Sequence, residues 1–271
     1  MATSELRTYI CTGIPVQYYA RVPAKCKMNS TVNNTPPIDG QSSEEEKPCH
    51  SDQTQYVELF GGAIHCKLPK TFMDTSTFRP VPDNQEVWLS PEFKDGCFVA
   101  ELLQFQGEAT QDNPLPYFFR DLAIHNSVEE GKYWLVEDSC QVYHNLPFEP
   151  EQQFVLGDVI ARQDDNTHPS ASSSQITVST GIGLQCVSSR SSYVQHLPPP
   201  FDQLQPKQEA SWVQIEICLL RLSNVQTDIL ITLSKPLLAA SAVKNGADIT
   251  HGKEFEEICK SFKIVAWSLF V

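Results

Sequence analysis

The sequence has no run of apolar residues long enough for a transmembrane helix, which needs about 20 of them. It also has no CxxC pair, so the usual anchor of zinc sites and thioredoxin-type sites is missing. The nine cysteines are an odd number and lie scattered along the chain. This pattern favours reduced thiols in the cytosol or nucleus. Because no apolar run is long enough to span a bilayer, we expect no direct insertion into a membrane.

Common enzyme signatures are absent as well. The sequence contains no GxSxG, HExxH or GxxxxGK[ST] motif, and no GxGxxG follows a candidate strand. The seven histidines show no metal-ligand spacing. We therefore expect a non-catalytic protein without a metal site or a cofactor.

Negative charge is concentrated in one part of the chain. The net charge is −13, and residues 106–165 contain 12 acidic and 3 basic residues, which gives 9 of the 13 excess negative charges. Such a surface repels nucleic acid and anionic membranes and attracts a basic protein partner. The alternative is an acidic face that only keeps the protein in solution.

Two segments have the composition of flexible chain. Residues 1–55 alternate short apolar pieces with polar, proline-containing stretches and are expected to form a disordered leader. A transit peptide is the alternative for the leader, because its first 28 positions contain four basic residues and one acid. Residues 164–209 are rich in Ser, Gln and Pro, which predicts a flexible insertion. One strand-like alternation, Ile176–Val187, lies within that insertion.

The remaining residues, 56–271, are expected to form one domain. Period-two patterns and turn residues predict strands over Val57–Phe60, Ala63–Leu68, Glu86–Leu89, Cys97–Phe105, Trp212–Leu222 and Thr227–Leu233, and more weakly over Lys132–Val142 and Phe154–Ala161. Antiparallel strands in sequence, with helices over their faces, predict a layered α+β domain.

Two helices are expected from apolar residues at helical spacing. The first covers Asp112–His125, with Asn113 as its N-cap and Pro114 at its first position. Its apolar stripe consists of Leu115, Phe118, Phe119 and Leu122. The second is a C-terminal helix whose apolar positions are Phe255, Ile258, Cys259, Phe262, Val265 and Ala266.

Candidate functional residues cluster between Arg79 and Val87. Pro82 fixes its φ angle and Asp83 favours a tight turn, which would hold Asp83 and Glu86 on a stiff connection. The simplest alternative is that Asp83 caps the turn and Glu86 begins a strand in solvent. A further alternative is a hydrolase that uses the two carboxylates as acid and base. An enzyme needs a concave pocket with perturbed carboxylates, whereas a binding module should show an open acidic surface.

Several segments resemble those of one known family, the Ran guanine nucleotide release factors. They are Leu59–Ile64, Leu68-Pro69, Asp74–Ser76, Arg79–Val87, Glu101–Leu103, Gly157–Arg162, Leu219–Leu222 and Gln226–Thr232. The resemblance covers about residues 56–163 and 210–271 and omits the leader and the insertion. It implies an α/β/α sandwich built on a mostly antiparallel central sheet and flanked by helices, related to PsbP-type domains.

The resemblance also implies a function. It implies binding of the small GTPase Ran, release of its guanine nucleotide, a role in nucleocytoplasmic transport, and residence in the nucleus and cytoplasm. The residues that it assigns to Ran contact are Asp83 and Glu86, and we extend this expectation to Asn84, Gln85 and Arg79. We expect a monomer. The alternative is an adaptor or trafficking protein for another partner on the same scaffold, without exchange activity.

Overall fold

The structure, a computed structural model, describes residues 53–90, 96–109, 112–147, 152–161, 175–187, 211–237 and 251–270. The expected leader lies outside these residues except for its last positions, where the first strand begins at Thr54. The parts of the expected insertion on either side of 175–187 also lie outside them.

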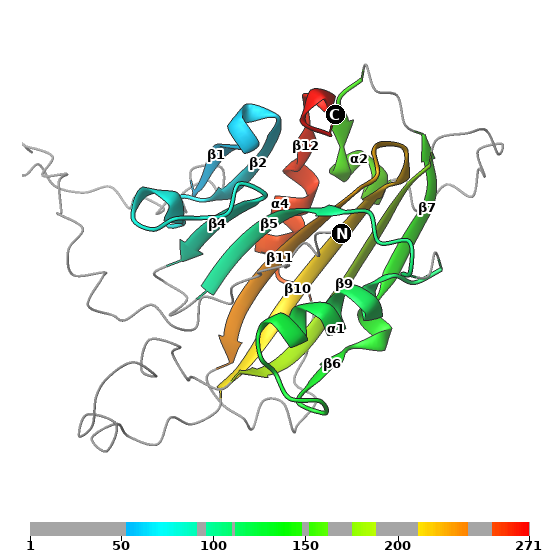
Figure 1. Cartoon of the computed structure of the whole chain (residues 1–271). Coiled ribbons are helices and arrows are strands. Elements are labelled where there is room, and N and C mark those ends of the chain that lie inside the picture. The colour runs from blue at the N-terminus through cyan, green and yellow to red at the C-terminus, as the bar shows by residue number, and fades with distance from the viewer. Residues whose placement is uncertain are drawn as a thin grey trace, which may run out of the picture. The chain divides into compact units, whose positions relative to one another are not determined.

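Within the ranges that the structure describes, the larger of two sheets contains eight strands, and every pairing in it is antiparallel (Figure 1). In spatial order these are β3 (Met73–Asp74), β4 (Gln85–Ser90), β5 (Gly96–Gln104), β11 (Thr227–Leu237), β10 (Ser211–Leu222), β9 (Gln175–Val187) and β6 (Tyr133–Leu135), and β7 (Gln141–Pro147) also pairs with β9. Strands β10 and β11 form the expected hairpin, with Leu222 opposite Thr227. Its short turn ends at Gln226, whose φ of 50° lies in the left-handed region.

The smaller sheet joins distant parts of the chain. It contains β1 (Thr54–Leu59), β2 (Ile64–Pro69), β12 (Lys263–Ile264) and β8 (Phe154–Val155), again all antiparallel. Strand β12 lies between β2 and β8, so the C-terminal region is fixed beside the first hairpin.

Both faces of the larger sheet are covered by helices. Alternating residues of β10 point to opposite sides because side chains alternate along a strand. Val213, Ile215, Ile217 and Leu219 belong to one buried cluster together with the apolar stripe of α1 (Leu115–His125). Cys218, Leu220 and Leu222 belong to the other, together with residues of α2 (Leu156–Ala161) and α4 (Lys253–Ser261). The expected α+β class, with a mostly antiparallel sheet between helices, is confirmed.

The first expected helix is shorter than predicted. It begins at Leu115 after Pro114, and Asn113 Oδ1 accepts a hydrogen bond from the Leu115 N–H at 3.3 Å. All four residues of the apolar stripe are buried, as predicted.

Two other assignments are wrong in part, and the structure fixes the end of the C-terminal helix, which the sequence pattern left open. Phe154–Ala161 was expected to be a strand, but only Phe154–Val155 is extended and α2 follows it. Lys132–Val142 was expected to be one strand, but a short 3-10 turn separates β6 from β7. The helical spacing of the C-terminal region continues to Ala266, but α4 ends at Ser261 because the chain leaves it to pair as β12.

The strand-like alternation in the expected insertion is a central strand. Strand β9 pairs with β10 along its length, from Ile176 opposite Leu222 to Val187 opposite Ser211. Two of its glycines give α1 room, because a Cβ on Gly183 would lie 2.1 Å from the Phe119 ring. Residues 175–187 therefore belong to the folded domain and not to a flexible insertion.

Candidate functional site

The predicted turn is closed by backbone hydrogen bonds. We call residues 81–86 the acidic turn. The Gln85 N–H donates to the Pro82 carbonyl at 2.9 Å, as a β-turn requires. Asn84 then continues the β4–β5 pairing, since its carbonyl accepts from the Leu102 N–H at 2.8 Å and its side chain donates to the Leu102 carbonyl at 3.1 Å. The turn is thus attached to the central sheet.

The five predicted contact residues differ in exposure. Asp83 and Asn84 are exposed, and Arg79 and Glu86 are half-buried. Gln85 is only 4% exposed, and its Nε2 donates to Glu101 Oε1 at 2.7 Å across the sheet. The structure therefore brings Asp83 and Glu86 to one turn, but the side chain of Gln85 faces the interior.

Glu86 is held by a second turn. The backbone N–H of Phe60 donates to Glu86 Oε1 at 2.6 Å. Phe60, Gly61 and Gly62 have φ angles of 50°, 64° and 89°, a left-handed run that glycine adopts easily. The Gly61-Gly62 pair thus allows the chain to reverse so that this N–H points at the carboxylate.

The environment of Glu86 favours its protonated form. Burial raises the pKa of this carboxyl, and the negative charge of Asp74 raises it further, while the hydrogen bond from Phe60 opposes both. The Asp74 carboxylate accepts from the Ser76 N–H at 2.8 Å and from Ser76 Oγ at 2.7 Å, and so caps its own short turn. The carboxylates of Asp74, Asp83 and Glu86, which come from two turns and from the start of β4, are therefore brought together.

A hollow of about 380 Å³ lies at this place. Its lining residues are Phe60, Gly61, Asp74, Ser76, Val81, Pro82, Asp83, Gln85, Glu86, Val87 and Leu269. Three of these described residues are acidic and none is basic. No local sequence pattern marks Phe60, Asp74 or Leu269 as site residues, because they reach the hollow through contacts between distant segments.

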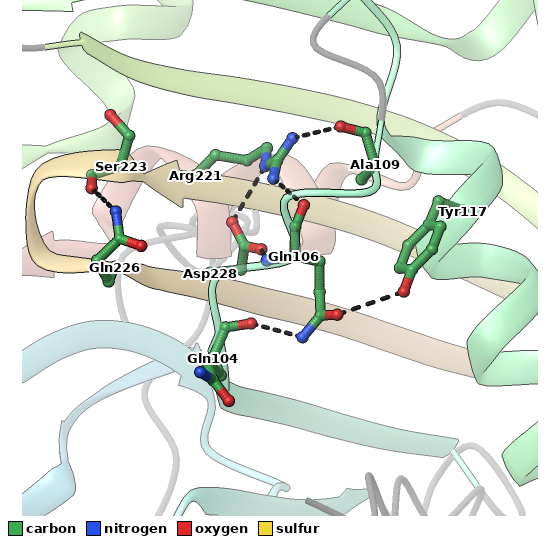
Figure 2. A network of polar contacts seen from close by, with 8 residues as sticks. All are labelled: Gln104, Gln106, Ala109, Tyr117, Arg221, Ser223, Gln226 and Asp228. Atoms are coloured by element: carbon green, nitrogen blue, oxygen red, sulfur yellow. Dashed lines mark hydrogen bonds and ion pairs between the residues drawn. The ribbon is translucent and has the colours of Figure 1, made fainter. Parts of the chain in front are cut away.

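A buried ion pair outside the hollow fixes the connection from β5 to α1. Figure 2 shows the Arg221 side chain between Asp228 and the carbonyls of Gln106 and Ala109, to which it donates hydrogen bonds. Its Nε lies 3.1 Å from Asp228 Oδ1, and the guanidinium stacks over the Phe105 ring at 4.3 Å. Because its N–H groups bind partners inside the protein, we assign Arg221 a structural role and not a role in binding.

Within the described ranges, no group of three or more His, Cys, Asp or Glu side chains has the geometry of a metal site. Among the helices that the structure describes, none is long and apolar enough to cross a membrane.

Comparisons with known proteins identify relatives. A family model described as "Ran-interacting Mog1 protein" matches residues 57–236. The chain is 27% identical over 217 residues to a Danio rerio protein named "Ran guanine nucleotide release factor", covering 78% of this chain and 97% of that protein. It is 26% identical over 230 residues to "Nuclear import protein MOG1" of Saccharomyces cerevisiae, covering 79% and 84%. The solved structure of the Saccharomyces cerevisiae Ran-binding protein Mog1p aligns with a TM-score of 0.48 and 20% identity, covering 80% of this chain and 98% of that one.

Proposed function

Because the chain belongs to the Ran-interacting Mog1 protein family, we propose that it binds the small GTPase Ran and promotes release of its guanine nucleotide. The names of the zebrafish and yeast relatives, a release factor and a nuclear import protein, support this assignment. A role in nucleocytoplasmic transport, in the nucleus and cytoplasm, follows from the same proposal.

The acidic turn is our proposed contact site. The observation that carries this proposal is the hollow, in which Asp83 and Glu86 lie together on a turn fixed to the sheet. We add two residues that do not line the hollow to the proposed contact surface, the exposed Asn84, which follows Asp83 in the turn, and the half-buried Arg79. The buried side chain of Gln85 supports the turn from inside, so we assign it a positioning role.

In the proposed mechanism, the carboxylates of this protein compete with the nucleotide phosphates for basic groups of Ran. A GTPase holds its nucleotide with a lysine, backbone amides and Mg²⁺. Carboxylates on a rigid turn would attract the basic groups that otherwise serve the phosphates. By linkage, a partner that binds the nucleotide-free form more tightly weakens nucleotide binding by the same factor. No covalent chemistry is needed, so we propose a non-catalytic regulator. We also propose that the protein acts as a monomer.

Two alternatives keep the same scaffold. The half-buried Glu86, with its raised pKa in a concave site, is also what an acid–base enzyme would present. Asp83, however, is exposed, and the family match favours a binding protein. The other alternative is an adaptor or trafficking protein that binds another partner on the same scaffold, without exchange activity.

The test is release of a fluorescent guanine nucleotide from Ran with and without the protein. We expect the wild-type protein to accelerate release, and Asp83→Lys and Glu86→Lys to remove the acceleration while the fold is kept. Glu129→Lys is the control, since it makes the same charge change at an exposed position away from the hollow. Binding without acceleration would refute nucleotide release. No binding and no acceleration would refute the proposed function and favour the adaptor for another partner.

A further inference from the structure

The C-terminal region forms one wall of the hollow. Leu269 lies in the short 3-10 turn Trp267–Phe270 and lines the hollow together with Glu86, although the two are far apart in sequence. Leu269 is half-buried, so part of its side chain is open to solvent. Nothing in the sequence pattern assigns this residue to the acidic turn.

This wall is attached to the turn that holds Glu86. The N–H groups of Val265 and Ala266 both donate to the Ala63 carbonyl, at 2.9 and 3.2 Å. Ala63 directly follows the Phe60–Gly62 turn, whose first N–H binds the Glu86 carboxylate. Trp267 Nε1 also donates to the Gln152 carbonyl at 2.8 Å, which fixes the start of the wall. The position of Leu269 relative to Glu86 is therefore set by hydrogen bonds.

The lining of the hollow has two kinds of surface. Three carboxylates provide negative charge, and five apolar residues provide a hydrophobic surface, namely Phe60, Val81, Pro82, Val87 and Leu269. Long basic side chains have the complementary composition, because an apolar stem carries a charged end. A neutral apolar group would leave the negative charges of the hollow without a positive charge beside them, and a small cation would leave the apolar surface in water.

We infer that Leu269 is a contact residue for Ran, which packs against the aliphatic stem of a lysine or arginine side chain while the charged end of that side chain reaches Glu86. The inference rests on the proposed function and extends it by naming the occupant of the hollow. Leu269 thus favours an extended basic side chain over a bare cation or a short polar group.

Equilibrium binding to Ran, measured by titration calorimetry, tests this assignment. We expect Leu269→Ala to weaken binding about tenfold, the loss typical of a well-packed contact at an interface. Ile124→Ala is the matched control, since Ile124 is 57% exposed on α1 and does not line the hollow. We expect its Kd to stay within about twofold of wild type. Leu269→Asn keeps the branching and the number of side-chain heavy atoms and decides the question if the alanine variant unfolds.

A double-mutant cycle with Glu86→Gln distinguishes one shared occupant from two separate contacts. If one side chain touches both residues, the double variant should bind more tightly than the product of the two single effects predicts. Effects that multiply, or a Leu269→Ala protein that binds as wild type does while Glu86→Gln is weakened, would overturn the inference and leave the proposed function standing. If the wild-type protein does not bind Ran at all, the proposed function fails and the inference fails with it.

Discussion

Phe60 and Glu86 are joined by a hydrogen bond of 2.6 Å between the Phe60 N–H and Glu86 Oε1. The donor follows strand β1 and the acceptor lies on strand β4, so the bond links the two sheets. A charge-assisted bond of this kind is short and directional, and it holds the carboxylate in one orientation. Because Glu86 is held in one orientation in a partly buried place, its ionisation should affect the binding of a partner.

As the pH falls, Ran binding should begin to weaken at a higher pH than it would if Glu86 had the pKa of an ordinary glutamate. Burial and the Asp74 charge raise the pKa of Glu86 above its ordinary value of 4.5, so the carboxylate takes up its proton earlier as the pH falls. Only the ionised form attracts a basic side chain. The Kd of the wild-type protein should therefore rise on acidification through that raised pKa, and the Kd of Glu86→Gln should not show this component.

The stability of the same two proteins should show the opposite trend. Below pH 4.5 Glu86 is protonated in both the folded and the unfolded chain, so it adds no pH dependence. As the pH rises from there through the raised pKa, the unfolded chain ionises first, and the wild-type protein loses stability relative to Glu86→Gln. Urea unfolding across this range measures the difference. A constant difference would show that the environment of Glu86 does not perturb it.

Gln85 should act on the fold and not on the partner. Gln85→Leu removes the hydrogen bond to Glu101, which is 1% exposed and would lose this donor. We expect the free energy of unfolding to fall by about 1–3 kcal/mol, the usual cost of removing a partner from a buried polar group. The Kd for Ran, measured on the folded fraction, should change little. A large loss of affinity without loss of stability would return Gln85 to the contact surface.

Gly183 should not accept a side chain while Phe119 is present. A Cβ at this position would lie 2.1 Å from the Phe119 ring, far inside contact distance. Gly183→Ala should therefore destabilise the protein by about 1–3 kcal/mol or more, as overpacking of a core does. Adding Phe119→Leu should recover part of that loss, which thermal unfolding can measure. If the two changes are simply additive, the ring and the glycine are not in contact.

Asp228 should be costly to remove because Arg221 is buried beside it. The two side chains are 0% and 5% exposed, so Asp228→Ala leaves a guanidinium without its carboxylate in the interior. Loss of one partner of a buried pair costs about 3–5 kcal/mol. The double variant Arg221→Met with Asp228→Leu removes both charges and should be more stable than Asp228→Ala in urea unfolding. Glu256→Ala provides an exposed-pair control and should change stability by less than about 1 kcal/mol.

The sequence predicts the elements whose pattern is local. The β10–β11 hairpin and the buried stripe of α1 repeat at strand and helix spacing, and both are confirmed. Strand β9 lies inside a segment that was expected to be a flexible insertion from its Ser, Gln and Pro content, although the strand-like alternation of Ile176–Val187 was recognised. In the structure two of those glycines provide room for Leu115 and Phe119, a reason that lies in another element.

The errors elsewhere also come from tertiary contacts. The residues of α2 include Val159 and Ile160, which favour strands, but Gly157 lies against the backbone of Lys260 at the end of α4. Helix α4 ends early because Lys263 and Ile264 find strand partners on both sides. The acidic turn itself was predictable, since Pro82 and Asp83 act locally, whereas Phe60 and Leu269 reach Glu86 only through the fold.

The order of strands in the larger sheet has a consequence for synthesis on the ribosome. Strand β5 pairs with β4 on one side and with β11 on the other, where Gln104 lies opposite Thr227. During translation β5 emerges long before β11, so one of its edges stays open in the nascent chain. An open strand edge can pair with another chain. The correct pairing of β5 with β11 joins residues far apart in sequence and is therefore slow. The yield of folded protein should therefore depend on how quickly the second half of the chain follows the first.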